Sequence, residues 1–206
     1  PNVEGLALEK TSADCDPIGV PEFDAVTTQT VNAAGTSSIF CAGDVSNYIP
    51  LLHEAADEGR IAGDNAARVA AGKPVSRGFR RAGLGIVFTD PQIAIVGGGW
   101  PALKAGQFAV GQVSFEDQGR SRILFKNQGL LNVYGDIATG RLLGAEMIGP
   151  AAEHIGHLLA WSLQNTMTVS QMLEMPFYHP VIEEGLRTAL RDLDAKLRAA
   201  TTGKAR

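Results

Sequence analysis

The sequence has little of what marks several large classes of protein. Its two cysteines, Cys15 and Cys41, are too few for a disulfide scaffold and fit no CxxC or zinc-finger spacing. It contains no run of about 18 apolar residues, so no membrane span or membrane partner is expected. Its 18 Lys and Arg against 22 Asp and Glu argue against a polybasic nucleic-acid-binding protein. No secretory leader is visible, and two reduced thiols are typical of a cytosolic protein, so we expect a cytoplasmic location.

Common catalytic and nucleotide-binding motifs are missing as well. No GxGxxG follows a predicted strand, and there is no GxxxxGK[ST], HExxH or GxSxG. A complete dinucleotide-binding domain is therefore not expected in these residues. What is present is 45% hydrophobic and 19% charged residues, which is enough apolar material for a folded core.

The first 80 residues read as loops followed by a strand and a helix. The opening 30 residues are irregular, and the apolar run at residues 38–44 predicts a buried strand that stops at a Gly-Asp turn. A helix is predicted over residues 51–71, because a glycine and a proline follow it as they usually follow a helix end. Its small residues recur at three-to-four spacing, which would let one face lie close to another backbone.

The composition changes after a basic, glycine-rich linker at residues 73–85. Short apolar and alternating runs then predict successive strands, with a hairpin turn at residues 136–140, and the period becomes helical from residue 151. Strands followed by helices predict an antiparallel sheet covered by helices, so the expected fold class of residues 86–206 is α+β. The expected strands are 86–88, 93–96, 108–115, 123–125, 130–134 and 142–148, and the expected helices are 151–166, 168–175 and 181–199.

The segment FYHPVIEE, which ends at Glu184, carries the most specific chemical signal. Pro180 suits the first position of a helix, because its missing N–H would be unpaired there anyway. His179 would then lie at the start of that helix, and a carboxylate from Glu183 or Glu184 could orient its imidazole as a general base. The alternative is that His179 only begins the helix and that both glutamates favour the positive end of the helix dipole.

The helical histidines are candidates for a metal site. His154 and His157 stand three residues apart beside Glu153 on a predicted helix. No third ligand occurs at a recognisable spacing, so no metal site is predicted and a polar helix surface is the favoured interpretation.

Two weaker signals for a functional site occur earlier in the chain. Gly43 and Asp44 follow the predicted strand, where a carboxylate could bind a ligand hydroxyl, although Gly-Asp turns at strand ends are common. His53, near the start of its helix beside Glu54, is most simply a helix-terminus residue.

Taken together and in order, these segments resemble a known family, the flavin-dependent pyridine nucleotide–disulfide oxidoreductases. The early segments are similar to the second half of the FAD domain of that family, and the later ones to its C-terminal interface domain. The resemblance covers nearly the whole chain, and within the family we favour the dihydrolipoamide dehydrogenase branch over the glutathione reductase branch. The early segments are PNV at 1–3, IFCAGDV at 39–45 and LLHEA at 51–55, and the later ones are VFTDP at 87–91, LG at 143–144, GPA at 149–151 and HP at 179–180 with Glu184.

The resemblance implies a division of the chain and a cofactor site. Residues 1–80 would be the C-terminal part of an FAD-binding α/β domain, and residues 86–206 the interface or dimerisation domain. The carboxylate of Asp44 would bind the ribityl hydroxyls of FAD, and the backbone at a helix start would face the flavin's pyrimidine edge. The implied cofactor-binding residues are Gly43, Asp44, Leu51, Leu52 and His53.

The resemblance also implies a reaction and a partner. His179 would be the acid–base catalyst for a dithiol and Glu184 its orienting partner, and in this family that histidine reaches the flavin site of the other subunit of a homodimer. The parent enzyme would oxidise a small dithiol, or a lipoyl-bearing protein, through a disulfide and FAD to NAD. Tyr178 stands where many members have a small residue, which leaves the substrate open.

The first half of the family's chain has no counterpart here. That half carries the FAD glycine motif, the redox-active cysteine pair and the NAD domain, and Cys15 and Cys41 do not stand in the context of that pair. The chain is therefore expected to be a C-terminal fragment that by itself binds neither FAD nor NAD. Two alternatives stay open, namely a non-catalytic dimerisation module and a fragment of a related NADPH-dependent disulfide reductase.

Overall fold

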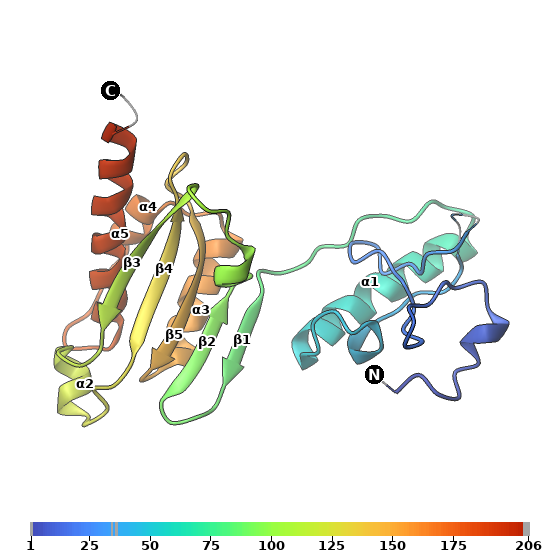
Figure 1. Cartoon of the computed structure of the whole chain (residues 1–206), viewed down its shortest axis with the longest axis horizontal. Helices are drawn as coiled ribbons and strands as arrows, with labels where there is room; N and C mark the ends of the chain where they lie inside the picture. Colours follow the sequence, from blue (N-terminus) through green and yellow to red (C-terminus); the bar gives the residue numbers. More distant parts are fainter. Residues whose placement is uncertain (1, 34, 36, 204–206) are drawn as a thin grey trace. The chain divides into compact units, whose positions relative to one another are not determined.

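The computed structural model describes residues 2–33, 35 and 37–203, and the chain divides into two compact units between Arg80 and Arg81 (Figure 1). No helix among the described residues is long and apolar enough to cross a membrane. That the first unit is the C-terminal part of an FAD-binding domain stays a prediction.

The first unit consists of loops packed around one helix. Its regular elements are two 3-10 helices, η1 (Leu8–Lys10) and η2 (Gly43–Ser46), and helix α1 (Leu52–Ala70). The strand expected over residues 38–44 is wrong, because this segment makes one isolated bridge, between Phe40 and Gln29, and then turns into η2. A strand needs a neighbour to pair with its backbone, and none of the described residues of this unit supplies a longer one.

Helix α1 confirms the helix predicted over residues 51–71. The small-residue face expected to approach another backbone does so at Ala55, where a Cβ atom added at Gly43 would lie 3.2 Å from Cβ of Ala55. The face stays open at Gly59 and Gly63, where an added Cβ atom would meet nothing within 4 Å. The buried side of α1 is instead largely polar. It consists of Glu54, Asp57, Glu58, Ile61 and Asn65.

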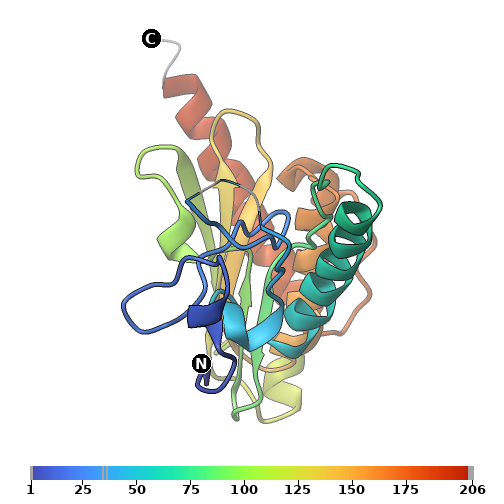
Figure 2. The ribbon, with the colours of Figure 1, turned by 90° about the vertical axis from the view of Figure 1, so that its right-hand side faces the viewer.

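The second unit is a five-stranded antiparallel sheet in the order β1-β2-β5-β4-β3, with the C-terminal α-helices on one face (Figure 1, Figure 2). This confirms the α+β architecture that was expected from strands followed by helices. The strands are β1 (Leu84–Val87), β2 (Gln92–Val96), β3 (Phe108–Ser114), β4 (Leu130–Asp136) and β5 (Leu142–Gly149). The helical elements are η3 (Trp100–Ala102), α2 (Gly119–Ile123), α3 (Ala152–Gln164), α4 (Val169–Leu173) and α5 (Glu183–Gly203).

The core of the second unit lies between the sheet and the helices. Alternate residues of each strand point to this side, whereas the helices contribute residues at three-to-four spacing. Helix α5 packs on β3 and β4, and α3 packs on β2 and β5. The most buried side chains include Leu131, Val133, Ala145, Ile155, Leu159, Leu190 and Leu193.

The hairpin turn predicted between β4 and β5 is confirmed. Oδ1 of Asp136 accepts hydrogen bonds from the backbone N–H of Thr139, at 2.6 Å, and from its hydroxyl, at 2.7 Å. These bonds, led by the one from the hydroxyl, lower the pKa of the Asp136 carboxyl below its usual value. Gly140 follows with a φ of 69°, a conformation that favours glycine.

The strand expected over residues 123–125 is wrong. The chain forms the short helix α2 there, and Phe125 follows with a φ of 55°. Gln118 caps this helix by accepting the N–H of Ser121 at 2.7 Å. An apolar run predicts a strand only if its side chains find a core, and Phe125 is 93% exposed.

The prediction that Pro180 occupies the first position of a helix is wrong as well. Helix α5 begins at Glu183, and the peptide bond between His179 and Pro180 is cis. The backbone N–H of Val181 donates to the Glu184 carboxylate at 3.3 Å, so a side chain instead of a helical hydrogen bond satisfies this turn.

We predict that Gly111→Ala destabilises the second unit by about 1–3 kcal/mol, the usual cost of overpacking a core. A Cβ atom at Gly111 would overlap the carbonyl oxygen of Ala189 and the side chain of Leu193, both on α5. Urea unfolding followed by tryptophan fluorescence measures this change, because both tryptophans, Trp100 and Trp161, lie in the second unit.

The matched control is Gly85→Ala in β1, where an added Cβ atom meets nothing within 4 Å. We expect this variant to change the free energy of unfolding by less than about 0.5 kcal/mol. Equal losses in the two variants would contradict the close packing of α5 on β3.

We also predict that backbone amides of α1 exchange with solvent faster than those of β4 and β5. Among the described residues, the buried apolar side chains of the first unit are Val20, Cys41 and Ile61, so little apolar burial opposes its opening. Hydrogen exchange followed by mass spectrometry of peptides measures this difference. Equal protection of α1 and β4 would show that the first unit is as stable as the second.

Candidate functional site

The structure brings His179 and Glu184 together at the start of α5. Nδ1 of His179 lies 2.9 Å from Oε2 of Glu184. The His179 side chain is 81% exposed, whereas that of Glu184 is only 19% exposed. The pair therefore has a fixed inner member and an outer member that faces solvent in this unit.

Three groups hold the Glu184 carboxylate. Besides His179, the N–H of Val181 donates to Oε2, and the Arg187 guanidinium donates to Oε1 at 3.0 Å. The guanidinium also lies over the Phe177 ring, 5.5 Å from its centre, in a cation–π contact. The hydrogen bond from His179, helped by the Val181 N–H and by Arg187, holds the pKa of the Glu184 carboxyl below its usual value.

The ionised carboxylate determines which nitrogen of His179 carries the proton. A carboxylate only accepts hydrogen bonds, so Nδ1 of His179 must donate to it. In the neutral ring Nε2 then has a free lone pair, and the exposed ring presents it to solvent. This arrangement can take up a proton at Nε2 and stabilise the resulting imidazolium.

In the first unit, Gly43 and Asp44 lie in the turn that precedes α1. The N–H of Gly43 donates to Oε2 of Glu58 at 2.7 Å. The φ of Gly43 is 75°, and an added Cβ atom would lie 3.2 Å from Cβ of Ala55, so the turn sits tightly against α1. Asp44 is exposed and therefore available to a ligand.

Leu51, Leu52 and His53 form the start of α1. No side chain caps this end of the helix. Leu52 is 90% exposed, and Nε2 of His53 lies 4.0 Å from a carboxylate oxygen of Glu54. Uncapped N–H groups and the positive end of the helix dipole attract a polar or negatively charged group.

The sequence reasoning missed the ion pair that supports this turn. Glu58 is completely buried, and the guanidinium of Arg80 donates to its Oε1 at 2.8 Å. Arg80 also donates to the Ala25 carbonyl at 2.7 Å and lies over the Tyr48 ring. Arg80 lies in the basic segment at residues 73–85, which is interpreted as a linker. The composition of this segment does not indicate that Arg80 forms a buried ion pair.

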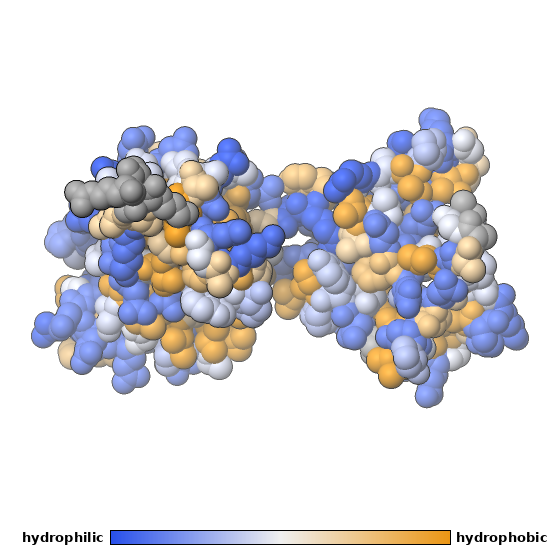
Figure 3. Space-filling view, turned by 45° about the horizontal axis from the view of Figure 1, so that its top comes forward, coloured by the Kyte–Doolittle hydropathy of each residue, from blue (hydrophilic) through white to orange (hydrophobic). Residues whose placement is uncertain are grey.

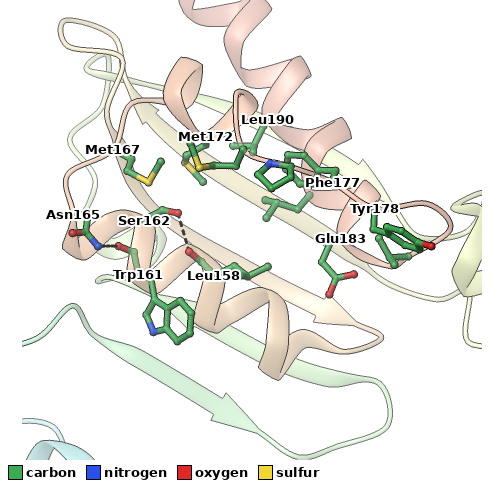
Figure 4. Close-up of a pocket in the computed structure, with 14 residues that line it drawn as sticks. Leu158, Trp161, Ser162, Asn165, Met167, Met172, Phe177, Tyr178, Glu183 and Leu190 are labelled. Atoms are coloured by element: carbon green, nitrogen blue, oxygen red, sulfur yellow. Dashed lines mark hydrogen bonds between the residues drawn. The ribbon is translucent and has the colours of Figure 1, made fainter.

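A pocket of about 440 Å³ lies between α3, α4 and the start of α5. Figure 4 shows Trp161 and Leu158 on one side of it, Met172 and Phe177 on another, and the Glu183 carboxylate near Tyr178. Its walls are mostly apolar, and Figure 3 shows apolar side chains at the surface of both units. Trp161 is 63% exposed at this surface.

The structure does not join His154 and His157 into a metal site. Nδ1 of His157 lies 2.6 Å from the carbonyl oxygen of Glu153, and its ring contacts Trp161 edge to face. Within the described residues, no group of three or more potential ligands could hold a metal ion.

The two cysteines are free thiols in the first unit. Cys15 is exposed and Cys41 is buried. Burial raises the pKa of the Cys41 thiol above its usual value, so this thiol is a poor nucleophile. This environment fits a structural thiol better than a redox-active one.

Known proteins resemble both the sequence and the fold. Dihydrolipoyl dehydrogenase from Thermus scotoductus is 34% identical over 94% of this chain and 40% of its own length. NAD(P)H dehydrogenase (quinone) from Mycobacterium tuberculosis is 27% identical over 95% of this chain and 38% of its own length. The crystal structure of LpdA from Mycobacterium tuberculosis superimposes with a TM-score of 0.74 at 26% identity, over 93% of this chain and 40% of that one.

The chain thus spans about 40% of the length of these relatives. Residues 84–190, most of the second unit, match the family described as pyridine nucleotide-disulphide oxidoreductase, dimerisation domain. The match begins at the first residue of β1 and ends inside α5, so it includes the sheet, the pocket and the pair formed by His179 and Glu184. The chain therefore belongs to the pyridine nucleotide–disulfide oxidoreductase family, with a second unit that is its dimerisation domain.

Proposed function

We propose that this chain is the C-terminal part of a flavin-dependent oxidoreductase of the dihydrolipoyl dehydrogenase type. The parent would oxidise a dithiol, through a disulfide and FAD, to reduce NAD. The observation that carries the proposal is the 2.9 Å contact between His179 and Glu184, which leaves Nε2 of an exposed imidazole free to accept a proton. The similarity to a dihydrolipoyl dehydrogenase over nearly the whole chain supports the substrate class.

The chemistry of dithiol oxidation needs a base. A thiol must lose its proton before its sulfur can attack a disulfide, and an imidazole changes charge near neutral pH. In the proposed reaction Nε2 of His179 takes that proton. The Glu184 carboxylate keeps the ring in the Nδ1–H form and stabilises the imidazolium, and Arg187 keeps the carboxylate in place.

The first unit contains groups that fit FAD. The exposed carboxylate of Asp44 suits ribityl hydroxyls, and the uncapped start of α1 suits the polar edge of a flavin ring. Gly43 keeps this turn close to α1, where an added Cβ atom would press against Ala55. FAD, when bound, would supply an acceptor for the electron pair that leaves the dithiol.

We further propose that the parent is a homodimer assembled through the second unit. The description of the matched family as a dimerisation domain supports this assembly. The exposed apolar side chains of α3, Leu158 and Trp161, offer a surface for a second copy, and they border the apolar pocket. In this assembly His179 would act in the flavin site of the other subunit.

A second candidate is a related NAD(P)H-dependent reductase with a different acceptor. The NAD(P)H dehydrogenase (quinone) that is similar over 95% of this chain favours it. Tyr178, which is 80% exposed beside His179, would then shape the substrate site. For the isolated chain, a non-catalytic dimerisation module remains the alternative.

We predict that His179→Gln in the longer protein lowers the rate of dithiol oxidation by about two to four orders of magnitude, the usual range for loss of a general base. Glu184→Gln should cost less, because it orients the imidazole without transferring the proton. Steady-state assays with dihydrolipoamide measure both changes, and flavin absorbance should show unchanged FAD content.

His154→Gln and His157→Gln are the matched controls for the catalytic prediction. Both histidines lie on α3 and contact Glu153, away from the pair at the start of α5. Turnover should therefore stay near normal as long as the dimer is undisturbed, which light scattering of each variant checks, because the His157 ring contacts Trp161. The assignment is wrong if either control abolishes turnover while His179→Gln keeps it.

We predict that the chain itself dimerises and that Trp161→Glu weakens the dimer about tenfold or more, because exposed aromatic residues commonly dominate interfaces. Light scattering should give about twice the 21.7 kDa of one chain. Phe125→Glu changes an even more exposed aromatic side chain outside α3 and should leave the dimer intact. A monomer at high concentration, or an unchanged dimer in Trp161→Glu, would contradict the proposed surface.

A further inference from the structure

The side chain of Gln118 connects two segments that are far apart in the sequence. Gln118 lies between β3 and α2, and its Nε2 donates to the carbonyl oxygen of Val181 at 2.8 Å. Its Oε1 accepts the N–H of Ser121 at 2.7 Å. One partner is an acceptor and the other a donor, so the amide can satisfy both in only one orientation.

The peptide groups on both sides of Val181 are therefore held. The Val181 carbonyl accepts from Gln118, and the Val181 N–H donates to Oε2 of Glu184. The same oxygen accepts from Nδ1 of His179, two residues earlier in the chain. Val181 thus connects the Gln118 side chain to the oxygen atom on which the carboxylate and the imidazole meet.

Gln118 belongs to a well-packed support. Ser121 is fully buried, and its hydroxyl lies 2.7 Å from the carbonyl oxygens of both Phe115 and Gln118. The Phe115 ring is fully buried against the first turn of α5, where a Cβ atom added at Gly185 would lie 2.8 Å from the ring. The segment from Phe115 to Ser121 therefore holds the backbone of Gln118 in a fixed position.

We infer that Gln118 is a positioning residue that keeps His179 and Glu184 in contact by holding the carbonyl oxygen of Val181. The catalytic importance of Gln118 rests on the proposed function, because the positions of His179 and Glu184 matter for catalysis only if the pair transfers protons. The contact itself can be tested in the 206-residue chain without cofactor, substrate or turnover.

The test is the tautomer of the His179 imidazole, read from nitrogen-15 NMR at about pH 9, well above the pKa of histidine in model peptides. The chain has four histidines, His53, His154, His157 and His179, so single His→Gln variants assign every ring. In the unmodified chain we expect His179 to be predominantly Nδ1–H. Without a fixed acceptor at Nδ1 the ring returns to a mixture of tautomers.

Two substitutions remove the donor of Gln118 in different ways. Gln118→Met keeps the length of the side chain but loses both hydrogen bonds. Gln118→Glu keeps an acceptor for the N–H of Ser121, and hence the cap of α2, and replaces the donor to Val181 with an anionic oxygen that cannot bond to its carbonyl. In both variants we expect the ratio of Nε2–H to Nδ1–H at His179 to rise about fivefold, as for the loss of one hydrogen bond.

Gln171→Glu is the matched control. Gln171 also accepts a backbone N–H at a helix start, that of Thr168 at 2.9 Å, but it belongs to α4. We expect the His179 tautomer to be unchanged in this variant. Urea unfolding shows that each variant is folded, and Gln118→Glu, which retains the helix cap, serves if Gln118→Met is not.

Glu184→Met separates failure of this inference from failure of the pair, because methionine keeps the length of the side chain and removes the carboxylate that accepts from Nδ1 of His179. If Glu184→Met shifts the tautomer and the folded Gln118 variants do not, Gln118 positions nothing and the inference is overturned while the proposed function stands. If Glu184→Met also leaves the tautomer unchanged, the pair itself is absent and both proposals fall.

Discussion

The close packing of α5 on β3 is the constraint on which the rest of the second unit depends. Gly111 has no side chain, so the backbone of α5 at Ala189 can lie directly against the strand. The helix is then fixed from its first turn, where Gly185 meets the ring of Phe115. Glu184 lies in that turn, so the core of the sheet determines where the carboxylate stands.

The sequence predicted the elements whose signals are local. Alternating runs and the turn at Asp136 located the hairpin of β4 and β5, because both signals act within a few residues. A contact of His179 with a nearby carboxylate was predictable for the same reason, since Glu184 lies five positions along the chain. The start of α5 was not, because Glu184 and Val181 form a turn where a helix was expected at Pro180.

What could not be predicted depends on residues far apart in the chain. Gln118 and Val181 are 63 positions apart in the sequence, and no spacing or periodicity predicts the hydrogen bond between them. Arg80 reaches the buried Glu58 from a segment whose composition is typical of a linker. The apolar run at residues 123–125 does not form a strand, because its side chains are exposed instead of packed in a core. Whether an apolar run is buried depends on the tertiary structure and cannot be read from the run itself.

The central claim is that the imidazole of His179 moves a proton during dithiol oxidation. Chemical rescue tests it most directly, because replacing His179 by alanine leaves a space of the size of one imidazole ring, which free imidazole can fill. In the longer protein we expect added imidazole to accelerate His179→Ala and to leave the unmodified protein unchanged. Wild-type rates in His179→Ala without imidazole, or no acceleration beyond that of other buffer bases, would contradict the claim.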